Sequence, residues 1–317
     1  MIKGLEQFLI QLTNEYKGQS IGKCANYIPA LSKQNPEMMA ISLYFPQGHT
    51  LNIGDTHYAF TVQSISKVFS FIAACTAIGI ESVLSKVDVE PTGDSFNSLL
   101  RFELSDAKKP FNPWINAGAI TVVSLLPGNS AEDKVNFVLD FLSSVIGKRL
   151  QINQDVFLSE WETADRNKAM VHFLKEKQIL SGDVDEILKA YTKLCSMELT
   201  VGDLAKFGCI LSTDGYDLEK REQVFPIKVA RLTKILMYTS GMYNGSGKFA
   251  TTIGIPAKSG VSGGILGIIP ASPKNHPLFV DGLGLGIFSP PLDENGNSVK
   301  SMIVMEKLFH HYPVTIF

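Results

Sequence analysis

The sequence predicts an α/β fold in which both ends of the chain build one antiparallel sheet domain and a helical domain is inserted between them. Two observations support this prediction. Short apolar segments bounded by turn residues occur near both ends of the 317-residue chain, and the middle carries mostly helical patterns. We therefore expect a sheet domain at residues 1–70 and 215–317, a helical insert at residues 71–214, and an active site at their interface.

The N-terminal part contributes one helix and one or two strands before a long helix. Residues 5–17 have the pattern of an amphipathic helix. Residues 40–45 alternate weakly and end at Pro46-Gln47-Gly48, which is typical of a strand, and residues 57–62 are a shorter candidate. A long apolar helix is expected from about Ser64 to Ile80.

The middle of the chain is predicted to be helical. Helical patterns cover residues 135–142, 167–177 and 183–195, and Asp183 is a suitable N-cap for the last of these. Another helix is expected after Thr200, where Thr200 and Asp203 resemble a capping box.

The C-terminal third is richer in glycine and proline. Val261 to Ile269 is a glycine-interrupted apolar run that suits a strand. Residues 284–288 and 301–305 flank the pair Asn295-Gly296, a strong turn signal. We expect a hairpin-like connection there.

Composition limits which classes of binding partner and which cellular compartment are expected. The chain is 45% hydrophobic and has a net charge of −2, so it can bury a large core but has no general basic field for nucleic acid or an anionic membrane. The longest apolar stretch, Val68 to Ile80, is too short to span a bilayer. The four cysteines form no C-x-x-C pair, so we expect free thiols in the cytoplasm.

No metal or organic cofactor is expected. The cysteines and histidines lack zinc spacing. The acidic segment Asp293 to Asn297 lacks the glycine at position six and the glutamate at position twelve that a calcium loop needs.

Ser64 and Lys67 are the first candidate catalytic pair. Positions i and i+3 share one face of a helix, so the two side chains can meet where the long helix begins. A serine hydroxyl needs a base before it becomes a good nucleophile, and a buried lysine with a lowered pKa can be that base. The helix N-terminus adds backbone N–H groups beside a developing oxyanion.

Lys258-Ser259-Gly260 is a second motif that strengthens the first. The triplet K-[ST]-G accompanies S-x-x-K in penicillin-binding proteins and β-lactamases, and both the order and the wide separation of the two motifs suit a serine β-lactamase-like fold. A β-lactamase or penicillin-binding-type hydrolase is therefore one interpretation of the pair, although the expected S-D-N triplet has no clean counterpart.

A series of collinear segments resembles the serine-dependent, bacterial-type glutaminase family. The resemblance spans about Gly22 to Leu308. The matching segments are Gly22 to Leu31, Gln63 to Phe69, Asn112 to Ala119, Ser159-Glu160 with Arg166-Asn167, Tyr191 with Cys195-Ser196, Gly241 to Tyr243, and Lys258 to Val261.

This resemblance implies hydrolysis of L-glutamine to L-glutamate and ammonia. Ser64 would attack the side-chain amide, Lys67 would take its proton, and the oxyanion would lie between the backbone N–H groups of Ser64 and Val261. Tyr27, Tyr191 and Tyr243 match tyrosines that line the family's site. Either Tyr191 or Tyr243 would relay protons, because a phenol both donates and accepts.

The resemblance also implies how the free amino acid is recognised. Asn116 and Asn167, with help from Tyr243, would bind the α-carboxylate, and Glu160 would pair with the α-ammonium. Lys258, with Ser259 and Gly260, would give electrostatic support. Relatives form dimers or tetramers, so a homodimer or homotetramer is implied. A catalytically inactive glutamine-binding module is the remaining alternative.

Overall fold

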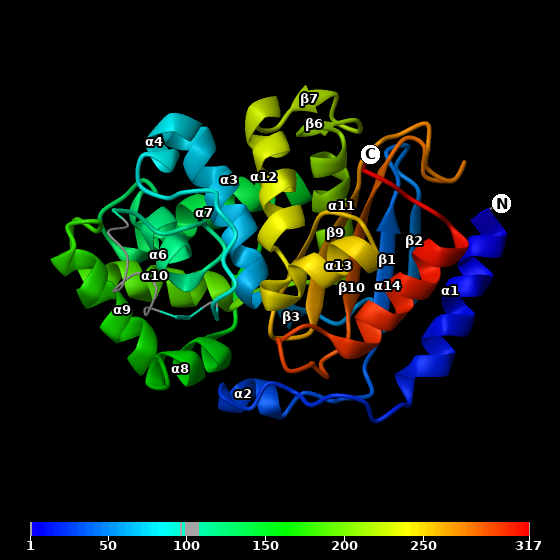
Figure 1. Ribbon diagram of the computed structural model, residues 1–317, viewed down its shortest axis with the longest axis horizontal. Coiled ribbons are helices and arrows are strands. Elements are labelled where there is room, and N and C mark those ends of the chain that lie inside the picture. The colour runs from blue at the N-terminus through cyan, green and yellow to red at the C-terminus, as the bar shows by residue number, and fades with distance from the viewer. Residues whose placement is uncertain (1, 96, 99–107, 317) are drawn as a thin grey trace.

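The structure is a computed structural model that describes residues 2–95, 97–98 and 108–316. It has two parts that lie side by side: a group of helices on the left of Figure 1 and a helix-covered sheet on the right. Both chain ends lie on the sheet side. A mixed α/β architecture with an antiparallel sheet is therefore confirmed.

The main sheet combines strands from both ends of the chain. Its order is β2-β1-β10-β9-β8, and each neighbouring pair is antiparallel. The strands are β1 (Ala40–Tyr44), β2 (Thr50–Gly54), β8 (Ala257–Ser259), β9 (Gly264–Ile269) and β10 (Leu283–Phe288). Strands β1 and β10 pair directly although they are far apart in the sequence, because the helical part of the chain leaves and returns at this sheet.

Helices cover both faces of this sheet. One face packs against α1 (Ile2–Lys17) and α14 (Val299–His311), which bury leucines and methionines against the strands. The other face packs against α11 (Val201–Ser212). The close approach of α11 needs glycine in β10, because a Cβ at Gly284 would lie 1.8 Å from the Ala205 carbonyl oxygen.

The helical part surrounds a long buried helix. At its centre, η1 (Gln63–Ile65) leads into α3 (Ser66–Ile78), whose first ten residues are buried. The surrounding helices are α4 (Ile80–Leu84), α6 (Asn116–Ser124), α7 (Ala131–Ile146), α8 (Gln154–Glu162), α9 (Asp165–Glu176) and α10 (Val184–Cys195).

Short elements connect the two parts. They include α2 (Pro29–Ser32) and a small sheet of order β3-β5-β4, formed by β3 (Phe60–Thr61), β5 (Met197–Leu199) and β4 (Gln151–Ile152). The strands β6 (Tyr216–Asp217) and β7 (Glu222–Gln223) form a separate pair. The longer helix α12 (Ile227–Ser240) follows, and then η2 (Tyr243–Gly245) and α13 (Ser246–Thr252). No helix in the described ranges is long and apolar enough to traverse a membrane.

The structure confirms the predicted helix caps and corrects one C-terminal expectation. Asp183 caps α10, and Thr200 with Asp203 forms the expected capping box at α11. The expected hairpin partner at residues 301–305 is wrong, because these residues lie in α14. Ser298 caps that helix, and Val304, Met305 and Leu308 then lie at helical spacing against the sheet.

The long apolar helix is confirmed, and it ends where Gly79 was expected to close it. Within the expected range Ser64 to Ile80, α3 ends at Ile78, and Gly79, whose φ is 86°, separates α3 from α4. The domain boundaries at residues 70 and 215 stay a prediction. Helix α11, which this division assigns to the helical insert, packs on the main sheet.

Candidate active site

Ser64 lies where the sheet part meets the helical part. Its short helix η1 follows β3 and precedes α3, and the side chain is 8% exposed. The preceding residue, Gln63, has a φ of 49°, a conformation that non-glycine residues adopt only when the surroundings enforce it. This kind of local strain is found disproportionately at functional sites.

Lys67 is one turn further along and is fully enclosed. It is 2% exposed, and its Nζ donates to the Trp114 carbonyl oxygen at 2.9 Å and to Asn116 Oδ1 at 2.8 Å. Burial lowers the pKa of Lys67 to about 8, although Cys195 and Glu160 oppose this shift. The amine is therefore able to be neutral near neutral pH, as a general base must be.

Asn116 joins three of the predicted residues. It is the first residue of α6, and its Oδ1 accepts from the Tyr191 hydroxyl at 3.2 Å as well as from Lys67. Its Nδ2 donates to Asn167 Oδ1 at 3.0 Å. A single amide thus links α3, α10 and α9 around the base.

Strand β8 brings the second motif against the first. A Cβ at Gly260 would lie 2.4 Å from the Val62 carbonyl oxygen, so glycine is needed for this strand end to approach the residues before Ser64. Lys258 is fully buried, and its Nζ donates to the Ser259 carbonyl oxygen at 2.7 Å. The Lys258-Ser259-Gly260 triplet therefore lies within the site, and Lys258 is not a surface lysine.

Tyr243 lies between the two motifs. Its hydroxyl donates to the Ser259 carbonyl oxygen at 3.2 Å, and the Lys258 Nζ lies 4.5 Å from the centre of its ring. Burial raises the pKa of Tyr243, and a hydrogen bond with the Ser64 side chain opposes that rise. Its φ of 52° is a second strained backbone conformation at this site.

Glu160 brings a buried carboxylate to the same place. Its Oε2 is closed to solvent and has no hydrogen-bond partner among the described residues. Burial raises the pKa of Glu160 to about 7, while Gln63 and Lys67 oppose the rise. Although it lies in a charged segment, Glu160 thus contributes a carboxylate oxygen that can accept from a cationic group.

Tyr27 and Val261 lie on the outer side of this cluster. Tyr27 is 53% exposed and Val261 is 4% exposed, and both line a cavity of about 410 Å³. Ser64 lies in the short helix η1 at the start of α3, and Val261 directly follows the Lys258-Ser259-Gly260 triplet. The backbone N–H groups of both residues are suited to an oxyanion.

Sequence reasoning missed a role for Gln63. Its side chain is 2% exposed, and its side-chain hydrogen bond lowers the pKa of Glu160. The strained backbone and the effect on the Glu160 pKa place it in the site. Its position directly before Ser64, in a segment that resembles the family, was the one signal that could have found it.

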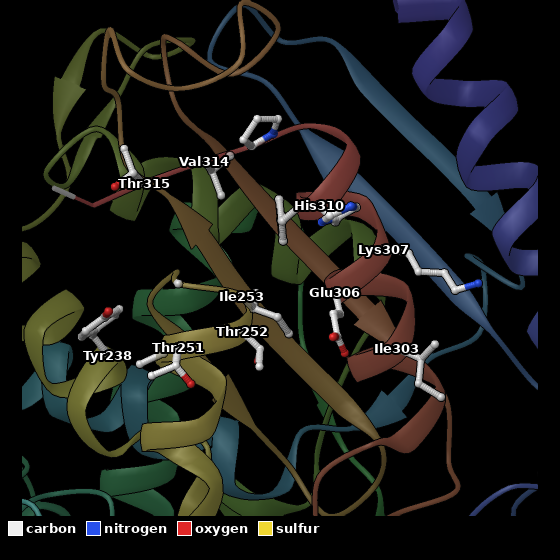
Figure 2. A pocket seen from close by; sticks show the side chains of 14 residues that line it. Tyr238, Thr251, Thr252, Ile253, Ile303, Glu306, Lys307, His310, Val314 and Thr315 are labelled. Atoms are coloured by element: carbon white, nitrogen blue, oxygen red, sulfur yellow. The ribbon is translucent and has the colours of Figure 1, made fainter.

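A larger cavity than the one beside Tyr27 and Val261 lies elsewhere. Figure 2 shows a cavity of about 770 Å³ between α12, α13 and α14, lined by side chains such as Tyr238, Ile253 and Glu306. It contains none of the predicted site residues. Among the described residues, no group of three or more His, Cys, Asp or Glu side chains is arranged to hold a metal ion.

The chain is similar to known glutaminases. It matches the protein family described as Glutaminase over residues 22–317. It is 50% identical to Glutaminase 1 of Bacillus subtilis (strain 168) over 296 residues, which cover 93% of this chain and 90% of that protein. These matches favour the glutaminase over a penicillin-recognising hydrolase.

Solved structures give the same result. The crystal structure of a probable glutaminase from Bacillus subtilis has a TM-score of 0.93 at 45% identity and covers 100% of this chain and 99% of that chain. The covalent complex of a Bacillus subtilis glutaminase with 5-oxo-L-norleucine, formed by reaction with 6-diazo-5-oxo-L-norleucine, has a TM-score of 0.88 at 45% identity, with 98% of each chain covered. These glutaminases have a β-lactamase-like fold, as predicted.

Proposed function

The chain belongs to the glutaminase family and hydrolyses L-glutamine to L-glutamate and ammonia, and we propose that it does so through an acyl-enzyme on Ser64. The observation that carries this mechanism is a buried amine, Lys67, with a pKa lowered to about 8 one turn from a buried serine. A neutral amine in that position activates the hydroxyl.

In the acylation step, Lys67 takes the Ser64 hydroxyl proton while Oγ forms a bond to the side-chain amide carbon. The C=O π electrons move onto oxygen, and the backbone N–H groups of Ser64 and Val261 stabilise this oxyanion. The C–N bond then breaks, and its electrons remain on nitrogen. The nitrogen takes a proton from Tyr191 or Tyr243 and leaves as ammonia, and the Lys67 ammonium returns the former Ser64 proton to that tyrosine.

In the deacylation step, water attacks the acyl carbon and gives a proton to Lys67. The bond from carbon to Ser64 Oγ breaks, and Oγ takes the proton from the Lys67 ammonium as L-glutamate forms. The two tyrosines are suited to moving protons because each hydroxyl donates and accepts. No step of this proposal needs a metal or an organic cofactor.

Substrate recognition rests on the groups around the nucleophile. Glu160 Oε2 is buried and has no partner among the described residues, so it suits the α-ammonium of glutamine. Asn116, Asn167 and Tyr243 would hold the α-carboxylate, and Tyr27 would cover the mouth of the site. The covalent complex with 5-oxo-L-norleucine, described for a relative, supports a covalently bound amino acid as an intermediate here.

Release of ammonia from L-glutamine by Ser64→Ala tests the proposal. We expect its kcat to fall by a factor of at least about 10³, because loss of a nucleophile leaves only binding and oxyanion stabilisation. Treatment with 6-diazo-5-oxo-L-norleucine should add mass to a peptide containing Ser64 in the wild type and not in the variant.

Ser70→Ala is the matched control, since Ser70 is a buried serine on the adjoining helix α3. It should retain nearly full activity and normal labelling. Equal ammonia release by the wild type and Ser64→Ala would refute the mechanism.

We also propose that the protein acts in the cytoplasm as a homodimer or homotetramer. The four cysteines are free thiols, which agrees with a reducing compartment. On α12, Ile227 and Ile235 are 47% and 59% exposed, and an interface between copies of the chain would cover them. No nucleic acid partner is part of this proposal.

A further inference from the structure

Lys258 is a completely buried lysine to which the acylation and deacylation steps assign no task. Burial of an amine is costly unless it gains compensating interactions. Burial and the nearby Lys67 lower its pKa well below the ordinary value. Its presence at the site therefore calls for a role that its contacts can explain.

The contacts of Lys258 converge on Tyr243. The Lys258 Nζ donates to the Ser259 carbonyl oxygen at 2.7 Å, and the Tyr243 hydroxyl donates to the same oxygen at 3.2 Å. The same Nζ lies 4.5 Å from the centre of the Tyr243 ring. Lys258 thus lies against the ring of this tyrosine and shares the acceptor of its hydroxyl.

The two candidate relay tyrosines have different partners. The Tyr191 hydroxyl donates to Asn116 Oδ1, the oxygen that also accepts from Lys67. Tyr243 makes a hydrogen bond with the Ser64 side chain. Tyr191 is therefore associated with the base, whereas Tyr243 is associated with the nucleophile and the bonds that change there.

We propose that Lys258 is a positioning residue that acts through Tyr243, holding its hydroxyl beside Ser64 so that Tyr243, and not Tyr191, protonates the leaving nitrogen. This inference rests on the proposed function. The Ser259 carbonyl oxygen accepts a shorter hydrogen bond from Lys258 and a longer one from Tyr243. The longer hydrogen bond is the weaker one, so it opposes transfer of the Tyr243 proton to the leaving nitrogen less.

Tyr243 gives its hydroxyl proton to the leaving nitrogen and regains a proton from Lys67. As the C–N bond of the tetrahedral intermediate breaks, its electron pair stays on nitrogen, which takes the Tyr243 hydroxyl proton and leaves as ammonia. The Lys67 ammonium, which carries the former Ser64 proton, then returns a proton to the Tyr243 oxygen. Lys258 takes no part in the bond changes and keeps Tyr243 in place throughout.

The test is a double-mutant cycle between Lys258→Met and Tyr243→Phe, measured as ammonia release from L-glutamine. Methionine keeps much of the side-chain length and removes the amine. We expect Lys258→Met alone to lower kcat about 30-fold or more, within the range of proton-transfer effects, and to change KM less than about threefold. In the Tyr243→Phe background, Lys258→Met should lower kcat less than about threefold, because the hydroxyl that Lys258 positions is absent.

Lys300→Met is the matched control. Lys300 is also completely buried and donates to two backbone carbonyls, those of Lys17 and Pro36, but it lies on α14 away from the site. This variant should lose stability without changing kcat in either background. In a Tyr191→Phe background, Lys258→Met should still cost about tenfold or more, since it acts through the other tyrosine.

Thermal unfolding is recorded for every variant. If Lys258→Met does not fold, Lys258→Leu, which also removes the amine, replaces it under the same criteria. An unchanged kcat, or an equal loss with and without the Tyr243 hydroxyl, overturns the inference. Ser64→Ala is assayed in parallel: full activity in that variant would show instead that the proposed function fails.

Discussion

At the scale of single residues, two buried ionisable groups set the chemistry. Burial disfavours the charged form of each, so the pKa of Lys67 falls to about 8 and that of Glu160 rises to about 7. The mechanism needs Lys67 neutral and Glu160 ionised. Both groups are mostly in the required form above about pH 8.

The pH dependence of kcat/KM for L-glutamine follows from these two groups. Raising the pH through about 7 ionises Glu160, and raising it through about 8 frees the Lys67 amine, so kcat/KM should increase across both. In a plot of the logarithm of kcat/KM against pH, we expect a slope near one between these two pKa values and a steeper slope below both. Initial rates measured from about pH 5.5 to about pH 9.5 test this.

Glu160→Gln is the informative variant in this series. Loss of a charge-assisted hydrogen bond to the ammonium should lower kcat/KM by about tenfold to 150-fold. The limb set by Lys67 should remain but move to lower pH, because the Glu160 charge raises the Lys67 pKa, while the steeper part should vanish. A wild-type profile that is flat between about pH 6 and about pH 9 would contradict the assigned roles.

At the scale of elements, glycines determine how closely the secondary structures approach. Gly284 and Gly286 in β10 let α11 lie against the sheet, and Gly260 lets the end of β8 reach the residues before Ser64. The sequence shows these glycines but not their neighbours. For β10 the close neighbour is a helix rather than another strand.

Gly284→Ala should destabilise the protein. Its Cβ would lie 1.8 Å from the Ala205 carbonyl oxygen and 2.2 Å from the Cys209 nitrogen, so backbone must move. We expect a loss of about 1–3 kcal/mol in the free energy of unfolding, as for other overpacked cores. Urea denaturation followed by circular dichroism measures it.

Gly4→Ala is the control of opposite sign. Gly4 lies in α1, and a Cβ added there would meet no described atom within 4 Å, so alanine should stabilise the helix by up to about 1 kcal/mol. Equal stabilities for Gly284→Ala and the wild type would show that α11 does not pack as described.

At the scale of the whole molecule, the site is assembled from distant parts of the chain. Ser64 and Lys67 precede the helical segments, Asn116, Glu160 and Tyr191 lie within them, and Tyr243 and Lys258 follow. A bound amino acid would therefore contact both parts of the fold at once. Ligand binding is expected to stabilise the two parts together.

L-Glutamate, the product, should raise the unfolding temperature as one cooperative transition. A ligand at about 100 times its Kd adds about 2.7 kcal/mol. For a chain of this size, that corresponds to an increase of several degrees. Differential scanning calorimetry with increasing L-glutamate tests this, and Glu160→Gln should show a smaller shift. Two transitions, only one of which moves with ligand, would disprove the shared site.

The sequence by itself determined the local features and the family. Capping at Asp183 and Thr200 depends on contacts within one turn, so neighbouring residues suffice to predict it. The motifs Ser64 to Lys67 and Lys258 to Gly260 can also be identified from the sequence, because each is a short run of residues with a definite chemistry.

Only the tertiary structure decided features that depend on distant neighbours. Residues 301–305 suit a strand or a helix by composition, and packing of α14 on the sheet selects the helix. Glu160 lies in a charged segment, and its burial beside Lys67 follows from how α8 meets η1 and α3. The convergence of Lys258 and Tyr243 on the Ser259 carbonyl joins separate elements. Burial and charge pairing are properties of the assembled fold, which is why no local pattern could reveal them.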